Sequence, residues 1–118
     1  MAPCPPSPNC VASLATDPEH HVDPLRIIGD PTHAMDDLRR IIESMPRTRI
    51  VAASNTALHA EFRSRIFRFV DDVDLQLEGR VVQIRSASRT GYSDLGVNRR
   101  RVEEIRRAFA TQGGAHPN

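Results

Sequence analysis

The chain contains no tryptophan, one tyrosine and four phenylalanines among its 118 residues. This scarcity of aromatic rings argues against a surface on which nucleic-acid bases stack. Lysine is also absent, so all sixteen basic residues are arginines. The net charge of +1 is far from the strongly basic balance that is typical of nucleic-acid-binding domains. We therefore expect no nucleic-acid partner.

Long apolar segments are absent too. No run approaches the roughly 20 apolar residues that a membrane-spanning helix needs, so we expect no membrane span. Residues 1–6 lack the apolar core of a signal peptide, and on this ground we expect a cytoplasmic location. With 39% hydrophobic and 26% charged residues, the composition is that of one globular domain of ordinary size.

The motifs of common nucleotide-binding and catalytic sites are missing. Neither G-x-G-x-x-G nor G-x-x-x-x-G-K-[ST] occurs, and G-x-S-x-G and H-E-x-x-H do not occur either. We predict no cofactor and no catalytic residue. The alternative is a hydrolase-type enzyme. In that case His59 and Glu61, on one face of a strand, would support acid–base or nucleophilic chemistry together with a nearby hydroxyl group from Ser86, Ser88 or Tyr92.

Residues 1–24 hold six prolines and are predicted to form an extended arm packed on the domain. Cys4 and Cys10 lie in this arm with five residues between them. They form a disulfide if the arm bends between them, which would imply an oxidising compartment, or they stay free thiols. A metal site that recruits His20 and His21 lacks the compact Cys/His spacing of known metal sites, so we predict no metal.

Two segments have the period of a helix. Thr32 is expected to cap the first segment and Pro46 to end it, and Asp36 is placed to pair with Arg40. Asn98 is expected to cap the second. The apolar side chains that recur at helical spacing are Met35, Leu38, Ile41, Ile42 and Met45 in the first segment and Val102, Ile105 and Phe109 in the second.

Between these helices the period changes to two. Strands are predicted near residues 50–53, 58–63, 67–78 and 81–88, with Gly79 in the tight turn between the last two, and a brief strand is predicted at 25–28. In the third long strand the odd positions from Phe67, including Phe69, are expected to face inward. Asp71 falls among these apolar positions, so its carboxylate must be paired, displaced by a β-bulge or functional, and we favour pairing with one of the arginines.

These elements predict an α+β fold in one small domain. An antiparallel four-stranded meander carries helices on one face, and the Pro-rich arm of residues 1–24 lies across it. The domain is predicted to span residues 25–112, followed by a disordered tail at 113–118. The oligomeric state does not follow from these patterns.

The stretch R-S-A-S-R-T-G-Y-S-D-L-G-V-N-R-R-R, residues 85–101, is the most polar part of the core region. It leaves a strand and enters a helix, whose first N–H groups favour anions, and arginine holds a carboxylate or phosphate with two hydrogen bonds. We predict that the protein binds an anionic or polar small molecule there. The predicted ligand-binding residues are Arg63, Arg85, Ser86, Ser88, Arg89, Tyr92, Ser93, Asp94, Asn98 and Arg99.

An internal network is the alternative. In that case Arg85 and Arg89 pair with carboxylates of this chain, and His59 is structural. The protein would then be a structural or protein-interaction module. The acidic residues within reach are Glu61, Asp71, Asp72 and Asp94.

Three segments carry a family resemblance: C-P-P-S-P-N-C-V, L-H-A-E-F-R-S-R-I-F-R-F-V-D-D-V and the stretch at 85–101. They closely resemble the domain-of-unknown-function family 1499, from Cys4 to about Phe109. The resemblance implies one small domain with no established activity, and Met35 stands where the family commonly has tryptophan. Such proteins occur in bacteria and plant plastids and often carry a leader or lipid anchor. The resemblance therefore leaves a periplasmic or membrane-associated location open.

Overall fold

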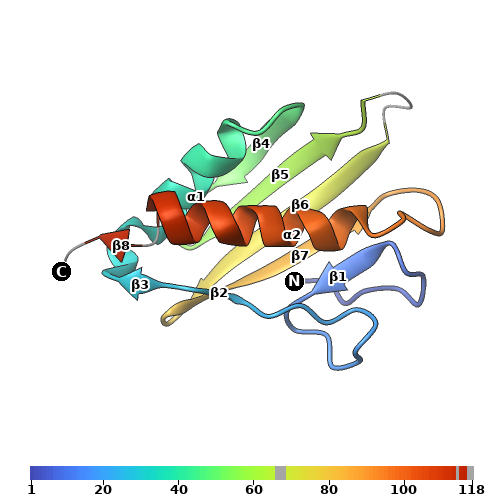
Figure 1. The fold of residues 1–118 in the computed structure, drawn as a ribbon, viewed down its shortest axis with the longest axis horizontal. Helices are drawn as coiled ribbons and strands as arrows, with labels where there is room; N and C mark the ends of the chain where they lie inside the picture. Colours follow the sequence, from blue (N-terminus) through green and yellow to red (C-terminus); the bar gives the residue numbers. More distant parts are fainter. Residues whose placement is uncertain (66–68, 114, 117–118) are drawn as a thin grey trace.

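The structure of the chain, a computed structural model, describes residues 1–65, 69–113 and 115–116. Its centre is an antiparallel sheet in the order β1-β7-β6-β5-β4, in which β2 also pairs with β7 (Figure 1). The four long strands follow one another along the chain and in space, which confirms the predicted α+β meander. They are β4 (Thr48–Ala53), β5 (Ala57–Arg63), β6 (Val70–Glu78) and β7 (Val81–Ser88).

The N-terminal arm adds one strand that the sequence pattern did not predict, β1, and the predicted brief strand contributes a second, β2. β1 (Cys10–Ala12) and β2 (Leu25–Arg26) both pair antiparallel with β7, so the sheet has six strands rather than four. Strands of two or three residues are too short to display an alternating pattern. The strand predicted at 25–28 is divided into β2 and β3 (Ile28–Gly29), with buried Ile27 between them.

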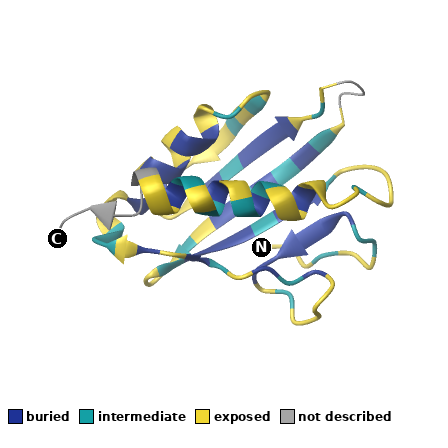
Figure 2. Cartoon of the chain, viewed as in Figure 1, coloured by how far each residue is buried: buried dark blue, intermediate teal, exposed yellow. Residues whose placement is uncertain are grey.

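Both helices cover the same face of the sheet (Figure 1). α1 spans Ala34–Glu43, and α2 spans Val97–Ala108 and continues as a π-helical turn at Phe109–Gly113. Their buried sides face the strands and their exposed sides face solvent (Figure 2). The largest fully buried apolar side chains of the core between helices and sheet are Leu25, Leu38, Ile42, Val73, Leu75, Val82, Ile84, Val102 and Ile105. On the opposite face of the sheet, here called the outer face, lies none of the helices that the described residues form (Figure 1).

The predicted start of α1 is wrong. A 3₁₀ turn at Pro31–His33 precedes α1, and the side chain of Asp30, not of Thr32, caps it by accepting the Thr32 N–H at 3.0 Å. Proline at the first position of the turn suits such a start because it has no N–H to satisfy. The ion pair in the first turns also differs, since Arg40 pairs with Asp37 rather than with Asp36.

The predicted cap of α2 is wrong as well. The cap position is Gly96, in a left-handed conformation with φ 81°, and Asn98 already lies in the first turn. The carboxylate of Asp94 accepts the backbone N–H groups of Gly96 at 2.8 Å and of Asn98 at 3.0 Å. Asp94 therefore caps the helix from the preceding loop, which frees the Asn98 side chain for contacts inside the domain.

Two other predictions concern the ends of elements. Phe69 was predicted to face inward, but β6 begins at Val70 and the Phe69 side chain is 54% exposed. Phe67 lies outside the described residues. In the predicted tail, Ala115–His116 forms β8 and pairs in parallel with β3, whereas residues 114 and 117–118 lie outside the described part. None of the helices in the described residues has the length and apolar character needed to cross a membrane.

Candidate functional site

The predicted ligand-binding residues separate onto the two faces of the sheet. Successive side chains of a strand point to opposite faces, and the register pairs Asp74 with Arg85 and Val73 with Ser86. The residues on the outer face are His59, Glu61, Arg63, Asp72, Arg85 and Arg89, and those toward the helices are Asp71, Ser86 and Ser88. The structure therefore contains two polar clusters, one on each face, instead of a single site.

The cluster on the helix side is centred on Asn98, which is fully buried. Its Oδ1 accepts hydrogen bonds from Ser86 Oγ at 2.6 Å and from Arg101 Nη1 at 2.9 Å. Its Nδ2 donates to Asp94 Oδ2 at 2.8 Å, Ser88 Oγ at 3.0 Å and the Asn9 carbonyl at 3.2 Å. All the hydrogen-bonding groups of this amide are therefore satisfied within the chain. The cluster joins α2, β7 and the N-terminal arm.

The cluster on the outer face is centred on Arg89. Its Nε donates to Asp72 Oδ2 at 2.7 Å, and its Nη2 donates to Glu61 Oε2 at 2.7 Å and Asp72 Oδ1 at 2.9 Å. Arg63 adds a longer contact to Glu61, at 3.4 Å. The hydrogen bonds from Arg89 lower the pKa of both Asp72 and Glu61 and keep them ionised. The fork of Arg89 is thus occupied by carboxylates of the chain itself.

His59 lies beside this cluster with a carboxylate at each ring nitrogen. Nδ1 is 2.5 Å from Asp74 Oδ1, and Nε2 is 3.0 Å from Asp72 Oδ1. Partial burial of the ring opposes its protonation, but the hydrogen bonds and charges of Asp74 and Asp72 outweigh burial and raise the pKa of His59. While the ring is protonated it donates at both nitrogens, and in that state this histidine has no free lone pair with which to act as a general base.

Arg85 has no ion-pair partner among the described residues. Its Nη2 donates to the Pro3 carbonyl at 3.2 Å, and its buried Nε has no hydrogen-bond partner in the described part of the chain. Asp74 is its neighbour across the β6–β7 ladder. The segment that contains Pro3 is joined to β1 by the disulfide Cys4–Cys10, whose Cα atoms are 5.7 Å apart. Residues 1–4 therefore lie over this part of the outer face.

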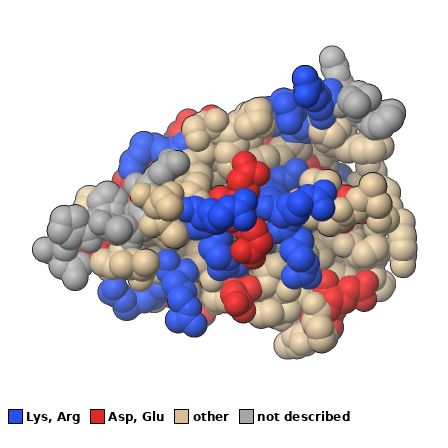
Figure 3. Space-filling view, in the orientation of Figure 1, with Lys and Arg blue, Asp and Glu red and all other residues tan. Residues whose placement is uncertain are grey.

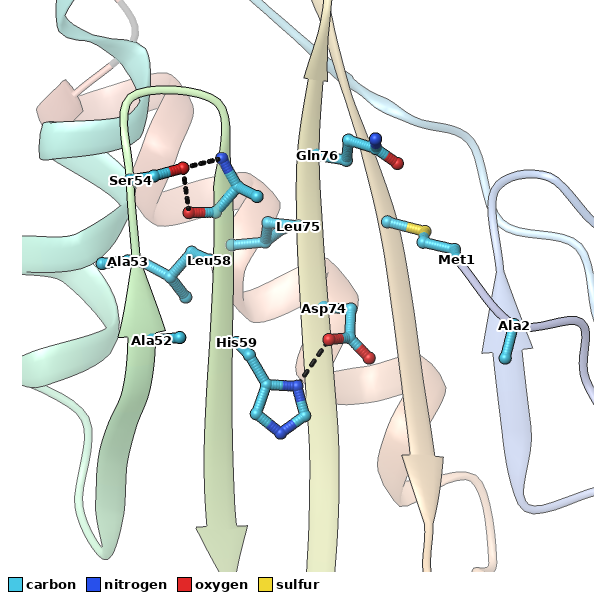
Figure 4. A pocket seen from close by; sticks show the side chains of 11 residues that line it. Met1, Ala2, Ala52, Ala53, Ser54, Leu58, His59, Asp74, Leu75 and Gln76 are labelled. Atoms are coloured by element: carbon cyan, nitrogen blue, oxygen red, sulfur yellow. Dashed lines mark hydrogen bonds and ion pairs between the residues drawn. The ribbon is translucent and has the colours of Figure 1, made fainter.

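A pocket of about 380 Å³ opens on the outer face next to this segment (Figure 4). Its apolar lining comes from the β4–β5 hairpin, through Ala52, Ala53 and Ala57, with Met1 and Ala2 at one side. Leu58 and Leu75 also border the pocket, but their side chains are buried in the core on the helix side of the sheet. Its polar lining is His59, Asp74, Gln76 and Ser54. Asp74 and Gln76 were not among the predicted site residues. Polar residues that alternate along a strand have the same pattern whether they line a site or only face solvent.

The remaining predicted residues serve the β7–α2 connection. Tyr92 is 71% exposed, and Ser93 Oγ accepts the Leu95 N–H at 3.3 Å. Arg99 donates to the carbonyls of His21 at 3.0 Å and Glu19 at 2.9 Å, which ties α2 to the N-terminal arm. None of these three side chains lines the outer-face pocket.

One group of potential metal ligands occurs in the described residues, formed by Asp17, Glu19 and His20. His20 Nδ1 is 2.5 Å from Asp17 Oδ2, and its Nε2 is 2.9 Å from the Ser7 carbonyl. Both ring nitrogens of His20 therefore contact groups of the chain itself, and these contacts hold the turn at residues 17–20.

In a comparison with known protein families, a family model described as "Protein of unknown function (DUF1499)" matches residues 1–109 of the chain. The matched part contains both polar clusters, the outer-face pocket and every element from β1 to α2. No curated protein matches the sequence.

Proposed function

Because the chain belongs to the DUF1499 family, which is described only as proteins of unknown function, we propose its function from geometry: it is a non-catalytic domain that binds a small polar ligand in the outer-face pocket. One observation carries the proposal. The pocket combines small apolar side chains of the β4–β5 hairpin with the carboxylate of Asp74 and the amide of Gln76, and its volume of about 380 Å³ is that of a small-molecule site.

The chemistry of the ligand follows from the groups that remain unpaired. Asp74 uses Oδ1 to hold His59, and its Oδ2 has no side-chain hydrogen bond within the described residues. In the same residues the Gln76 amide makes no side-chain hydrogen bond, and it also lines the pocket. A free carboxylate oxygen binds donors. We therefore propose a compact ligand that carries an amine or hydroxyl group beside a small apolar part.

This proposal moves the site away from the arginines of the sequence prediction. Arg89 and Arg63 already hold Glu61 and Asp72, so an anion at these guanidinium groups would have to displace carboxylates that are fixed in place. An anion that displaced one of these carboxylates would break the hydrogen bonds between that carboxylate and the arginine. A ligand that binds Asp74 Oδ2 breaks no hydrogen bond of this kind.

Catalysis is not part of the proposal because the pocket lacks a nucleophile and a free base. Ser86 and Ser88 face the helices, on the other side of the sheet from His59. Ser54 is at the pocket, but its Oγ accepts the N–H groups of Thr56 and Ala57 in the β4–β5 turn. His59 has a carboxylate at each nitrogen. At this pocket, therefore, no hydroxyl group of the described residues lies beside a base that could take its proton.

A structural or protein-interaction module remains the second candidate. It is supported by the occupied arginines, since Arg89 bridges two strands through Asp72 and Glu61 and Arg101 bridges a strand and a helix. In that case both polar clusters serve to fix the fold.

A thermal-shift screen tests the two candidates. We expect small amines, amino acids or polyols to raise the melting temperature, and carboxylates and phosphates to have less effect. Asp74→Asn removes the free carboxylate, and Ala57→Phe fills the pocket from an exposed position on β5. Both variants should abolish the shift. Glu43→Gln, the same kind of change on the exposed side of α1, should retain it. A screen without any shift, or a shift unchanged in both variants, refutes the ligand site and leaves the structural module.

A further inference from the structure

Exposed apolar side chains gather at one end of the molecule, where the β7–α2 loop projects (orange in Figure 1). Leu95 is 84% exposed and Tyr92 71% exposed, and Val97 follows at the start of α2. Phe69 lies at the same end, because the neighbouring Val70 carbonyl accepts the Arg89 N–H at 3.0 Å. Scattered single apolar residues are ordinary on a protein surface, but a group of them in one place marks an interaction site.

The backbone of this loop holds Leu95 outward at a cost. Leu95 has φ 55°, in the left-handed region that side chains other than Gly, Asn and Asp rarely adopt. The loop is held in this shape by Asp94, which caps α2, and by Arg100, whose Nη1 donates to the Leu95 carbonyl at 2.9 Å. With 84% of Leu95 exposed, little packing within the domain compensates for this strain, which points to a role in contact with something else.

Arginines lie at the same end of the sheet, where Arg63, the last residue of β5, pairs with Val70 at the start of β6. Arg47 and Arg63 exchange hydrogen bonds, Arg47 Nε to the Arg63 carbonyl at 3.2 Å and Arg63 N to the Arg47 carbonyl at 3.0 Å. A cavity of about 210 Å³ lies between Arg47 on one side and Val97 and Arg100 on the other. Figure 3 shows basic side chains at the top of this end of the molecule.

Three arginines at this end are available to an anionic partner. Arg47, Arg65 and Arg100 are exposed, and none of them forms an ion pair with a carboxylate of the described residues. We call this surface the loop end and define it by its apolar and basic members, which are Phe69, Tyr92, Leu95, Val97, Arg47, Arg65 and Arg100.

We propose that the loop end docks the protein onto the surface of an anionic lipid bilayer. Tyr92 and Leu95 enter the interfacial region, where an aromatic ring with a polar hydroxyl and an aliphatic side chain are both favoured. The arginines contact the phosphate groups of the lipids, which suit the guanidinium fork. The proposal does not depend on the outer-face pocket, since none of these residues lines it.

The shape of the loop end favours a bilayer over a protein partner. Its two most exposed apolar residues, Leu95 and Tyr92, belong to a loop that projects from the end of the domain (Figure 1). A protein partner would need a matching hollow to bury them, because protein interfaces are closely packed at their centre. A bilayer interface adapts to side chains that project, and its negative charge complements the arginines.

Sedimentation with lipid vesicles tests the proposal. The intact protein should bind to vesicles of phosphatidylcholine mixed with phosphatidylglycerol, and it should bind much less to vesicles of phosphatidylcholine alone. Binding should weaken as salt concentration rises. Tyr92 is the only tyrosine and the chain has no tryptophan, so its fluorescence reports on the loop end directly. We expect vesicles to protect this fluorescence from quenching by acrylamide.

Paired variants separate docking from folding. Leu95→Asn removes the apolar side chain and tolerates the left-handed backbone, so it should keep the melting temperature and lose vesicle binding. Leu14→Asn, at a 55% exposed leucine that lines a different surface, should keep both. Arg65→Gln should weaken binding roughly fivefold, and Arg107→Gln on the exposed side of α2 should not. Wild-type protein that does not bind the charged vesicles, binds both vesicle types equally, or binds as well after Leu95→Asn overturns the proposal.

Discussion

Arg101 joins α2 to β6 through Asp71, with Nη1 2.8 Å from Oδ2. The Arg101 side chain is 14% exposed and the Asp71 side chain 11% exposed, so water screens the pair only weakly. The guanidinium also lies over the ring of Phe62, 4.7 Å from its centroid. Asp71 is the carboxylate that interrupts the apolar positions of β6, and its partner comes from the helix rather than from Arg85 or Arg89.

We expect Arg101→Ala to destabilise the domain by about 3 kcal/mol, because it leaves Asp71 buried without a partner. Asp71→Asn should cost less, since an amide still accepts a hydrogen bond from Arg101. Urea denaturation of both variants and of the double variant measures the coupling between the two side chains. Arg107→Ala, at an exposed position of the same helix, is the control. A loss for Arg101→Ala no larger than for this control would show that the pair contributes nothing.

Asn98 should be more sensitive to substitution than its polar character suggests. Asn98→Ala removes an amide that links Ser86, Ser88, Asp94 and the Asn9 carbonyl, and leaves some of these buried groups without partners. We expect a loss of about 2 to 3 kcal/mol in the free energy of unfolding. Asn55→Ala, in the exposed β4–β5 turn, should change it by less than about 0.5 kcal/mol. Equal effects at the two positions would contradict the central role of Asn98.

The strand meander was predictable because alternation and Gly79 are local signals, and Gly79 indeed turns with φ 63° between β6 and β7. The need of Asp71 for a partner was predictable from its position among apolar residues. The identity of that partner was not, because the contact between Arg101 and Asp71 depends on how α2 crosses the sheet. Local patterns carry no information on that crossing.

The same limit explains the predicted ligand site. The arginine-rich stretch divides between two faces, because Ser86 and Arg85 are adjacent on a strand and must point in opposite directions. The outer-face pocket brings Met1 beside Asp74 and Gln76, across more than half of the chain. No spacing of residues in the sequence predicts a contact between segments so far apart. The short strand β1 and the capping of α2 by Asp94 were missed for a related reason, since each involves too few residues to form a pattern.

Reduction of the disulfide Cys4–Cys10 should destabilise the domain moderately. Cys10 is buried on β1, and the bridge closes a short loop, for which chain entropy gives about 2 kcal/mol. We expect a reductant to lower the melting temperature of the wild-type protein and to have no effect on Cys4→Ser, which should already melt at the lower temperature. A wild-type melting temperature that is indifferent to reductant would mean that the bridge does not contribute to stability. Disulfides of this kind persist mainly in oxidising compartments.

His59 should make stability depend on pH. Its pKa is raised by Asp74 and Asp72 above the value near 6.5 of the unfolded chain, despite the opposing effect of burial. The folded state therefore binds the proton more tightly. Its stabilising contribution is fully present below about pH 6.5 and is lost as pH rises through the higher folded-state pKa. Urea denaturation of the wild type and of His59→Gln should give free energies of unfolding that differ most in mild acid.

The difference should then shrink as pH rises, because neutral His59 can donate to only one of its two carboxylates. Asp74→Asn serves as the matched control, since it removes one of the two charges that favour protonated His59 while keeping the ring. The pH at which the difference disappears should be lower in the Asp74→Asn background. Histidine NMR titration measures the same pKa independently of unfolding. If the difference in free energy of unfolding between wild type and His59→Gln stays constant or grows with pH, His59 is held as the neutral ring. The pocket beside Asp74 would then contain one positive charge fewer.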